Sequence, residues 1–472
     1  MTRLTFYGGV GEIGGNKILL EDSSTRILLD FGMSFTQAGK YFDEFLQPRC
    51  LNGIGDYLIT GLIPSIKGLY RRDLQNRDYG LNSGQSLIGA ILLSHGHIDH
   101  SAFISLCDPD IPIHMTRLTK HVLDTLQSTG ISGLETEFLE VSIRKQGASK
   151  YVKKRRDITT HLSGDQFTVG SFKIFIFGVD HSLPGAAGYI IQTSDCSIVY
   201  TGDIRLHGTH SELTRKFIEE AARAKPDVLI IEGTNIDEEK RDSEADVERK
   251  VLDFLSNERI KDKTVFTVFP ARDIDRLNTF YRIAKSLGRK LVISMKQAYL
   301  LDLLEGEKEY PSPSLNNDEM LVHVPRRRWP EIEEPAYFLW ERIYLSHKNS
   351  ITSRELSKDP AKFLVYLDFY SLKELIDIHP PEDSYYIHSR SEPFSEEMML
   401  DDRLLNNWLE LFRLKRFQAH ASGHASGKEI AEAINSISPK RVFPIHTEHP
   451  EAFIALAPDV VLPEVGMQYT LT

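Results

Sequence analysis

One short segment of the chain holds an unusual density of groups that can bind a metal ion. The sequence SHGHIDH, at residues 94–100, places three imidazoles and a carboxylate within six residues, directly after a short apolar run. So many polar side chains are costly to bury at a strand end unless partners satisfy them. Side chains alternate along an extended segment, so His95 and His97 point the same way and can share one cation. The following turn directs Asp99 and His100 to a neighbouring position. The segment predicts two partial coordination spheres.

Isolated ligands at later strand ends are candidates to complete these spheres. His181 and Asp203 each follow an apolar run, as the first segment does. Either residue alone would be typical of an ordinary loop. Beside the histidine-rich segment, both become candidate metal ligands, because imidazole and carboxylate are the groups that zinc and manganese accept.

The predicted helices and strands that must hold these residues indicate a layered α/β protein. Short apolar runs near residues 173–178, 188–193, 197–200 and 228–231 predict strands, and residues 116–128 and 214–224 predict helices between them. After residue 232, strands alternate with helices in a βαβ rhythm, and residues 439–445 predict a final buried strand. Residues 305–360 are rich in Glu, Pro and Arg and are expected to be peripheral.

The opening sequence GGVGEIGG, residues 8–15, contains the G-x-G-x-x-G pattern of dinucleotide-binding turns. Such a turn must open a helix, because the pyrophosphate lies at the helix N-terminus. Here the glycines are followed by a second apolar run, a polar turn and a third apolar run. The context therefore predicts a glycine loop between strands rather than a dinucleotide site.

Composition bounds the remaining possibilities. The 472 residues suggest two domains, and the net charge of -11 argues against a protein that holds nucleic acid by being basic all over. Three scattered cysteines are typical of a reducing compartment, and no apolar run approaches the length of a membrane span. We therefore expect a cytoplasmic protein with no membrane partner.

The ligand pattern resembles the metallo-β-lactamase superfamily in its dinuclear form. The matching features are H-x-H-x-D-H, a lone His, a T-G-D turn and Asp30 at the end of an early strand. The resemblance implies an αββα sandwich with a metal centre at one edge. It assigns the first metal to His95, His97 and His181, the second to Asp99 and His100, and a bridge to Asp203.

Later segments resemble the β-CASP nucleases, in which another α/β domain is inserted into the lactamase fold. The segments are IIEGTN at 230–235, HASGHAS at 420–426 and FPIHTE at 443–448, and GGVGEIGGNK resembles the opening of ribonuclease J. The resemblance implies a discontinuous lactamase domain, residues 1–235 and 413–472, around a β-CASP domain of residues 236–412. It also implies that His446 completes the second metal site.

The same resemblance indicates a substrate and a reaction. RNA-processing members have histidine at the position of His446, whereas DNA-processing members have an aliphatic residue, so single-stranded RNA is expected. Two divalent cations, Zn²⁺ first and Mn²⁺ as the alternative, would activate water and clamp the scissile phosphate. Asp99, Glu232 and His424 are the expected catalytic residues, with His424, oriented by Glu232, as general acid.

Substrate phosphates are expected to bind near the H-x-S-G-H segment. His420 and Ser422 precede the helix that Ser426 opens, and HSRSEP at 388–393, which contains Ser389 and Arg390, approximates the T-G-S-Q-G-E-P turn of ribonuclease J. The approximation leaves open whether the enzyme is a 5′-to-3′ exonuclease, an endonuclease or both. A homodimer is one of the oligomeric states that the sequence leaves open.

Three other functions remain as alternatives. A DNA nuclease of the same group would use the same metal residues. A catalytically inactive β-CASP scaffold would be expected to lack metal ligands, and here all seven positions are filled. A small-molecule hydrolase of the wider superfamily would leave the inserted domain and the segment His420 to His424 without a role.

Overall fold

The computed structural model describes residues 1–82, 86–131, 133–144, 151–239, 242–257, 260–393 and 396–471. The chain folds into two compact units. The first unit is residues 1–241 together with 423–472, and the second is residues 242–422. The domain limits expected from the sequence, at 235/236 and 412/413, lie at different residues from these and stay a prediction.

The first unit contains a mixed sheet with the strand order β22-β1-β2-β3-β4-β5-β8. Its strands are β1 (Thr2–Gly8), β2 (Lys17–Asp22), β3 (Thr25–Phe31), β4 (Ala90–Leu92), β5 (Ile113–Thr116), β8 (Ile158–His161) and β22 (Gln468–Leu471). The sequence analysis expected the strand ending at Ile445 to be the last. That expectation was wrong, because β22 follows it and pairs antiparallel with β1.

A second sheet of the same unit has the order β21-β13-β12-β11-β10-β9. Its strands are β9 (Gln166–Val169), β10 (Phe172–Gly178), β11 (Ala187–Gln192), β12 (Ser197–Tyr200), β13 (Val228–Glu232) and β21 (Arg441–Ile445). Strands β12, β13 and β21 are mutually parallel. Their carboxyl ends therefore lie at one edge of the sheet.

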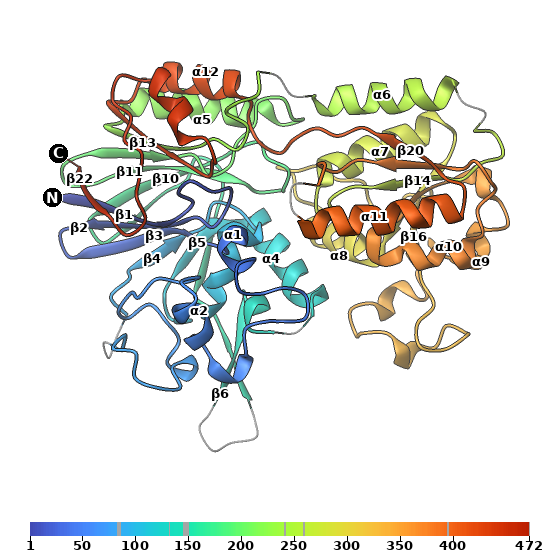
Figure 1. The fold of residues 1–472 in the computed structure, drawn as a ribbon, viewed down its shortest axis with the longest axis horizontal. Helices are drawn as coiled ribbons and strands as arrows, with labels where there is room; N and C mark the ends of the chain where they lie inside the picture. Colours follow the sequence, from blue (N-terminus) through green and yellow to red (C-terminus); the bar gives the residue numbers. More distant parts are fainter. Residues whose placement is uncertain are drawn as a thin grey trace. The chain divides into compact units, whose positions relative to one another are not determined.

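The two sheets of the first unit stack face to face. One apolar core lies between them and includes Leu4 and Ile18 from the first sheet and Ile174, Tyr189 and Phe443 from the second. Helices α5 (Ser211–Ala224) and α12 (Gly427–Ile437) cover the outer face of the second sheet, and α4 (Arg117–Thr129) packs near β5 and β8 of the first (Figure 1). The predicted αββα sandwich is confirmed.

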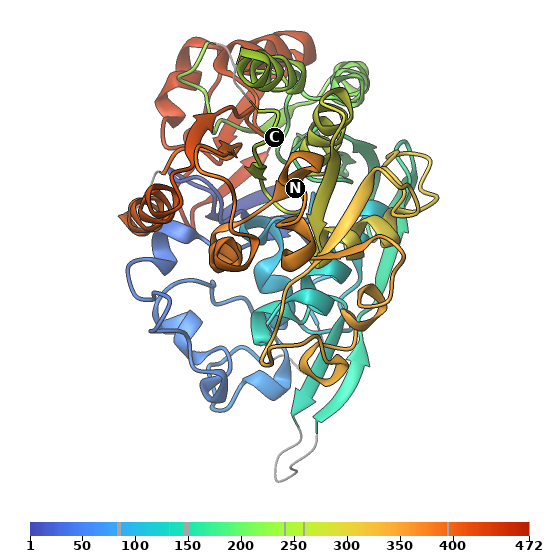
Figure 2. The same ribbon diagram turned by 90° about the vertical axis from the view of Figure 1, so that its right-hand side faces the viewer.

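Shorter elements complete the first unit. They are α1 (Phe35–Ala38), α2 (Gly55–Ile59), α3 (Ile98–Ser101) and the hairpin strands β6 (Glu140–Arg144) and β7 (Tyr151–Arg155). The antiparallel hairpin projects from the body of this unit (Figure 2). Helix α12 begins at the predicted cap, where Ser426 and Glu429 form a reciprocal capping box.

The glycine loop lies between strands, as predicted. Strands β1 and β2 flank residues 9–16 and pair antiparallel from Arg3 with Glu21 to Gly8 with Lys17. No helix follows the glycines, so the geometry of a dinucleotide-binding turn is absent from this described part of the chain.

The second unit is a parallel sheet with helices, which confirms the predicted βαβ rhythm. Its strand order is β17-β16-β15-β18-β14-β19-β20. The strands are β14 (Val265–Val268), β15 (Lys290–Ser294), β16 (Met320–Val324), β17 (Ser350–Thr352), β18 (Phe363–Tyr366), β19 (Tyr385–His388) and β20 (Lys415–Gln418). The helices are α6 (Glu244–Asn257), α7 (Ile274–Ser286), α8 (Met295–Leu304), α9 (Ser353–Leu356), α10 (Leu375–Ile378) and α11 (Glu396–Leu411).

Residues 305–360 were expected to be peripheral, and this is only partly correct. Strands β16 and β17 fall in this range and extend the sheet beside β15. Their side chains Met320 and Val322 are fully buried. The Glu- and Pro-rich composition concealed two short strands, because strands of three to five residues leave little periodic signal.

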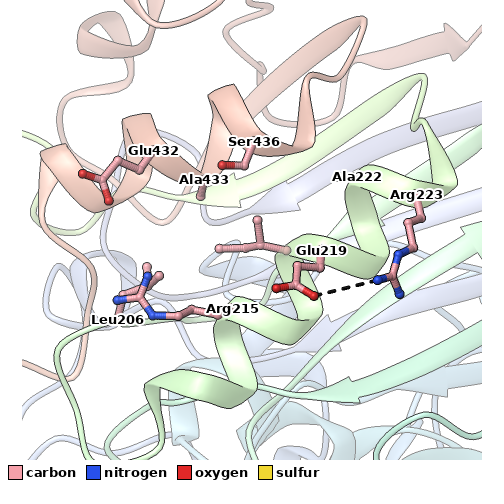
Figure 3. A pocket seen from close by; sticks show the side chains of 9 residues that line it. Leu206, Arg215, Glu219, Ala222, Arg223, Glu432, Ala433 and Ser436 are labelled. Atoms are coloured by element: carbon pink, nitrogen blue, oxygen red, sulfur yellow. Dashed lines mark ion pairs between the residues drawn. The ribbon is translucent and has the colours of Figure 1, made fainter.

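A groove with a volume of about 470 Å³ lies between α5 and α12 on the outer face of the first unit (Figure 3). Arg215, Glu219 and Glu432 are among the residues that line it, and none of the lining residues is a predicted site residue. Over the described ranges, no helix combines the length and the apolar character needed to cross a membrane.

Candidate metal centre

The predicted ligands lie at the ends of strands of both sheets in the first unit. His95 and His97 follow β4, and His97 is the N-cap of α3, which carries Asp99 and His100. His181 follows β10, Asp203 follows β12 and His446 follows β21. These strand ends bring residues that are far apart in sequence into one buried cluster.

One group of ligand atoms consists of His95, His97, His181 and Asp203. The His97 Nδ1 atom lies 3.0 Å from His95 Nε2 and 3.1 Å from His181 Nε2. Asp203 Oδ2 lies 3.5 Å from His95 Nε2. Ligand atoms at this spacing, converging from four side chains, fit the donor set of a tetrahedral cation site.

A second group consists of Asp99, His100 and His446. Asp99 Oδ2 lies 3.2 Å from His446 Nε2 and 3.8 Å from His100 Nε2. Asp203 Oδ2 lies 3.2 Å from His100 Nε2 and 3.7 Å from His446 Nε2, so this carboxylate faces both groups. The structure thus brings all seven predicted ligands together, and their binding of metal remains a prediction.

Four of the imidazoles are held at the ring nitrogen that points away from the cluster. The pairs are His95 Nδ1 with Ser94 Oγ (3.0 Å), His100 Nδ1 with Asp30 Oδ2 (2.7 Å), His181 Nδ1 with the Gly423 carbonyl (2.5 Å) and His446 Nδ1 with Thr234 Oγ1 (2.8 Å). Metal-binding histidines in proteins are usually fixed in this way, which sets the tautomer and the ring orientation.

The centre of the cluster contains polar atoms that the protein leaves unsatisfied. Both carboxylate oxygens of Asp203 and the Nε2 atom of His100 are buried, and none has a hydrogen-bond partner among the described residues. Buried polar atoms that make no hydrogen bond are costly. A bound cation would satisfy these atoms, so the residues present fit a metal centre.

The electrostatics agree with this donor set at His95, His181 and Asp203. At His100, burial lowers the pKa, but the Asp203 and Asp99 carboxylates outweigh it and raise this pKa well above its ordinary value. Burial lowers the pKa of His95 and of His181 well below the ordinary value, so both imidazoles are neutral and keep a lone pair for a metal. Burial alone would raise the pKa of Asp203, but the surrounding imidazoles, His100 foremost, hold it well below its usual range. Asp203 is therefore an ionised carboxylate.

The predicted catalytic pair also lies in the first unit. His424 Nδ1 is 3.2 Å from Oε1 and 3.1 Å from Oε2 of Glu232, which is fully buried at the end of β13. The backbone amides of Ile204 and Thr234 donate to the same carboxylate. Burial lowers the pKa of His424, but the Glu232 and Asp203 carboxylates outweigh it and raise this pKa to about 9. The imidazole of His424 is thus held in its charged form.

Sequence reasoning assigned no role to Thr234 or Tyr200. The Thr234 hydroxyl lies 3.2 Å from His424 Nδ1 and 2.8 Å from His446 Nδ1, so it links the catalytic pair to the second ligand group. The Tyr200 hydroxyl donates to Asp30, which holds His100. Both residues stand one to three positions from a predicted site residue, at the end of a buried strand, and that position was the available signal.

The predicted phosphate-binding residues Ser389, Arg390, His420 and Ser422 belong to the second unit. Ser389 is fully buried, and its hydroxyl accepts from Arg276 Nη1 at 2.6 Å and donates to the Ala419 carbonyl. His420 Nδ1 lies 3.3 Å from the same Arg276 nitrogen. Arg390 is exposed. The structure gathers Ser389 and His420 around Arg276 and leaves Arg390 at the surface.

Arg272 is a second cation of this unit that the sequence did not single out. It lies in the turn between β14 and α7, and its Nε atom is buried with no hydrogen-bond partner among the described residues. Burial lowers the pKa of its guanidinium. A partly buried guanidinium without a carboxylate partner is a natural contact for an anion such as phosphate.

Comparison with protein families gives two matches in this chain. Residues 71–257 match a model described as "Beta-lactamase superfamily domain". Residues 412–457 match a model described as "Zn-dependent metallo-hydrolase RNA specificity domain". The second match includes His420, His424 and His446.

Relatives and one solved structure resemble nearly the whole chain. Ribonuclease J of Thermus thermophilus is 25% identical over 98% of this chain and 73% of its own length. Ribonuclease J of Mycoplasma genitalium is 24% identical over 95% and 68%, and that of Pyrococcus abyssi is 24% identical over 95% and 90%. A crystal structure of a protein of unknown function from Enterococcus faecalis has the same fold, with a TM-score of 0.74 and 24% identity over 99% of both chains.

Proposed function

Because this chain belongs to the metallo-β-lactamase superfamily, in its β-CASP branch, we propose that it is a metal-dependent ribonuclease that hydrolyses phosphodiester bonds of single-stranded RNA. The observation that carries the proposal is the two groups of ligand atoms, both of which Asp203 Oδ2 approaches, beside His424 and Glu232. The match to an RNA specificity domain over residues 412–457 supports RNA as the substrate.

The proposed cofactor is a pair of divalent cations, Zn²⁺ or alternatively Mn²⁺. His95, His97 and His181 would hold one ion, Asp99, His100 and His446 the other, and Asp203 would contact both. Bound there, the cations would supply a water of lowered pKa and a clamp for the scissile phosphate. Imidazole-rich sites with carboxylates favour zinc, and manganese accepts the same donors.

The chain's own residues would manage the proton and the substrate. Glu232 keeps the His424 imidazolium charged and oriented, so His424 can donate a proton to the oxygen that leaves phosphorus. His420, Ser422 and Arg390 are the proposed phosphate contacts, whereas the predicted contact Ser389 is buried with its hydroxyl bonded to Arg276 and to the Ala419 carbonyl. We add Arg272 because its Nε atom has no hydrogen-bond partner among the described residues. The polarity of cleavage, 5′-to-3′ exonuclease or endonuclease, stays part of the proposal.

Digestion of matched substrates tests this function. Single-stranded RNA and DNA of one sequence, with 5′-triphosphate, 5′-monophosphate or 5′-hydroxyl ends on the RNA, would be incubated with metal-loaded protein. We expect RNA cleavage that a chelator abolishes, with mononucleotides from an exonuclease and internal fragments from an endonuclease. A preference for DNA, or fewer than one transition metal per purified chain, would overturn the proposal.

Substitution of His424 tests the proton donor. We expect His424→Ala to lower the cleavage rate by roughly 10²- to 10⁴-fold, the usual contribution of a general acid, while the metal content stays the same. His449→Ala is the matched control, because His449 is half exposed and pairs only weakly with Glu451 at 3.5 Å.

A homodimer stays a prediction, which the mass of the protein in solution would test.

A further inference from the structure

The glycine loop of residues 9–16 contacts the proposed second metal site through the main chain. The amide of Asn16 donates to the carbonyl of Asp99 at 3.1 Å, and the amide of His446 donates to the carbonyl of Gly9 at 2.7 Å. Both ends of the loop are therefore bonded to ligands of the second group. Within the described residues, these two main-chain hydrogen bonds join the loop to Asp99 and His446.

Gly14 lies directly against the side chain of Asp99. It has a φ of +80°, and a Cβ atom at this position would stand 2.7 Å from Asp99 Oδ2 and 2.8 Å from Asp99 Cβ. Such distances are shorter than van der Waals contact, so any larger residue would displace the carboxylate or the loop. The glycine is thus required by the backbone conformation and by the close approach together.

Gly11 offers a contrast within the same loop. It has a φ of +62°, so it carries the same left-handed backbone requirement as Gly14. A Cβ atom at Gly11, however, would meet nothing within 4 Å, and the residue is exposed. The two glycines therefore separate the cost of the backbone conformation from the cost of contact with Asp99.

The loop is anchored independently of the metal ligands. The buried Lys17 ammonium donates to the carbonyls of Gly15 and Gly32 at 2.9 Å each. The Glu12 carboxylate accepts a hydrogen bond from Ser34. The Lys17 ammonium thus connects the loop, at Gly15, to Gly32, which directly follows β3. These hydrogen bonds hold the loop in place beside Asp99.

We propose that the glycine loop positions the second ion site through Gly9 and Asn16, and that Gly14 sets the position of the Asp99 carboxylate. The inference rests on the proposed metal-dependent function. It predicts that the loop affects the affinity for one of the two ions far more than for the other, because it bonds Asp99 and His446 through the main chain and Gly14 lies against the Asp99 side chain.

Titration of metal-free protein with Zn²⁺ tests the proposal, with Gly14→Ala as the variant and Gly11→Ala as the control. Both variants place alanine at a positive φ, so both should lower the melting temperature of the metal-free protein, and Gly14→Ala should lower it more because its Cβ also contacts Asp99. Gly11→Ala should bind two ions as the unaltered protein does. Gly14→Ala should bind one ion normally and the other roughly 10- to 100-fold more weakly, the range seen when groups that orient ligands are changed.

The outcomes separate this inference from the function on which it rests. If the unaltered protein binds no zinc, the proposed function fails. If the unaltered protein binds two ions and Gly14→Ala binds both with unchanged affinity, only the loop's role is overturned. If Gly14→Ala does not fold, Glu12→Gln decides, because it weakens the anchor at Ser34 without backbone strain. Weaker binding of a single ion by that variant would support the proposal, and unchanged binding of both would overturn it.

Discussion

Each unit buries a cluster of charged side chains, at strand ends in the first unit and at the start of α6 and α7 in the second, and the two clusters differ in whether they are complete. In the second unit, Arg276 is fully buried and pairs with Glu244 through Nε and Nη2, at 2.8 and 2.9 Å. Its remaining donors reach the carbonyl and hydroxyl of Ser389 and the carbonyl of Ala421. The Glu244 carboxylate and these hydrogen bonds satisfy the guanidinium.

In the cluster of the first unit, by contrast, some buried polar atoms have no hydrogen-bond partner among the described residues. Both oxygens of Asp203 and the Nε2 atom of His100 have no hydrogen-bond partner among the described residues, although they are buried among ionisable groups. Since unsatisfied buried charge is expensive, its persistence indicates a cluster built for a partner outside the chain. The difference teaches that a complete ionic cluster supports the fold, whereas an incomplete one marks a binding centre.

Removal of the shared carboxylate should have the largest effect. Asp203→Asn keeps the size of the side chain and removes the charge that faces both ligand groups, so we expect loss of tight metal binding and a fall in RNA cleavage on the order of 10⁴-fold. Metal content and initial cleavage rates check this. Asp359→Asn, at an exposed carboxylate, is the control. If Asp203→Asn kept two ions and full activity, the cluster around Asp203 would not differ from the Arg276 cluster in the way proposed.

The complete cluster should respond in stability and not in metal binding. Glu244→Gln leaves the Arg276 charge buried without its anion, which should lower the free energy of unfolding by about 3–5 kcal/mol. Denaturant unfolding of the metal-free protein measures it, and metal titration should show no change. Glu248→Gln on the same helix is the matched control, because the Glu248–Arg282 pair is partly exposed and should contribute under about 1 kcal/mol. Loss of a metal ion in Glu244→Gln would contradict the comparison.

Asp30, which contacts the proposed metal ligand His100, should have an intermediate effect when it is changed. Asp30 accepts from the amide and hydroxyl of Ser94 and holds His100 Nδ1, and it has a φ of 56° that asparagine tolerates. Asp30→Asn should therefore preserve the backbone and weaken metal binding by roughly 10- to 100-fold. Zinc competition with a chelator measures the change. An unaltered affinity would mean that the ring of His100 is fixed by its other contacts.

The smallest expected effect sharpens the comparison within the second unit. Arg272 is partly buried, and its Nε atom has no hydrogen-bond partner among the described residues, unlike that of Arg276. Arg272→Met should raise the free energy of unfolding by about 1 kcal/mol, because it removes an unsatisfied polar atom from a partly buried position. The same variant should bind single-stranded RNA more weakly and with a smaller dependence on salt. A destabilised variant with unchanged RNA affinity would assign Arg272 to the fold instead.

Several features were predictable because their signals are local. The candidate ligands from His95 to His100 lie within six residues, so their ability to bind metal can be predicted from the sequence without knowing the fold. The strands on either side of the glycine loop and the Ser426 cap of α12 depend on neighbours a few residues away. Short-range periodicity and capping chemistry therefore identified these elements directly.

Other features depend on pairings that no local pattern records. The approach of His446 to Asp99, the link that Thr234 makes between two histidines, and the pairing of β22 with β1 join segments hundreds of residues apart. The contacts of Ser389 were likewise not predictable from the sequence. Only the tertiary structure reveals that its hydroxyl accepts a hydrogen bond from Arg276 and donates one to the Ala419 carbonyl. The sequence by itself determined which residues can bind metal and which local elements carry them. The tertiary structure decided which candidate ligands lie near Asp203 and which buried charges, such as Arg276, are paired inside the protein. Burial and the distances between partners arise only when distant strands and helices assemble.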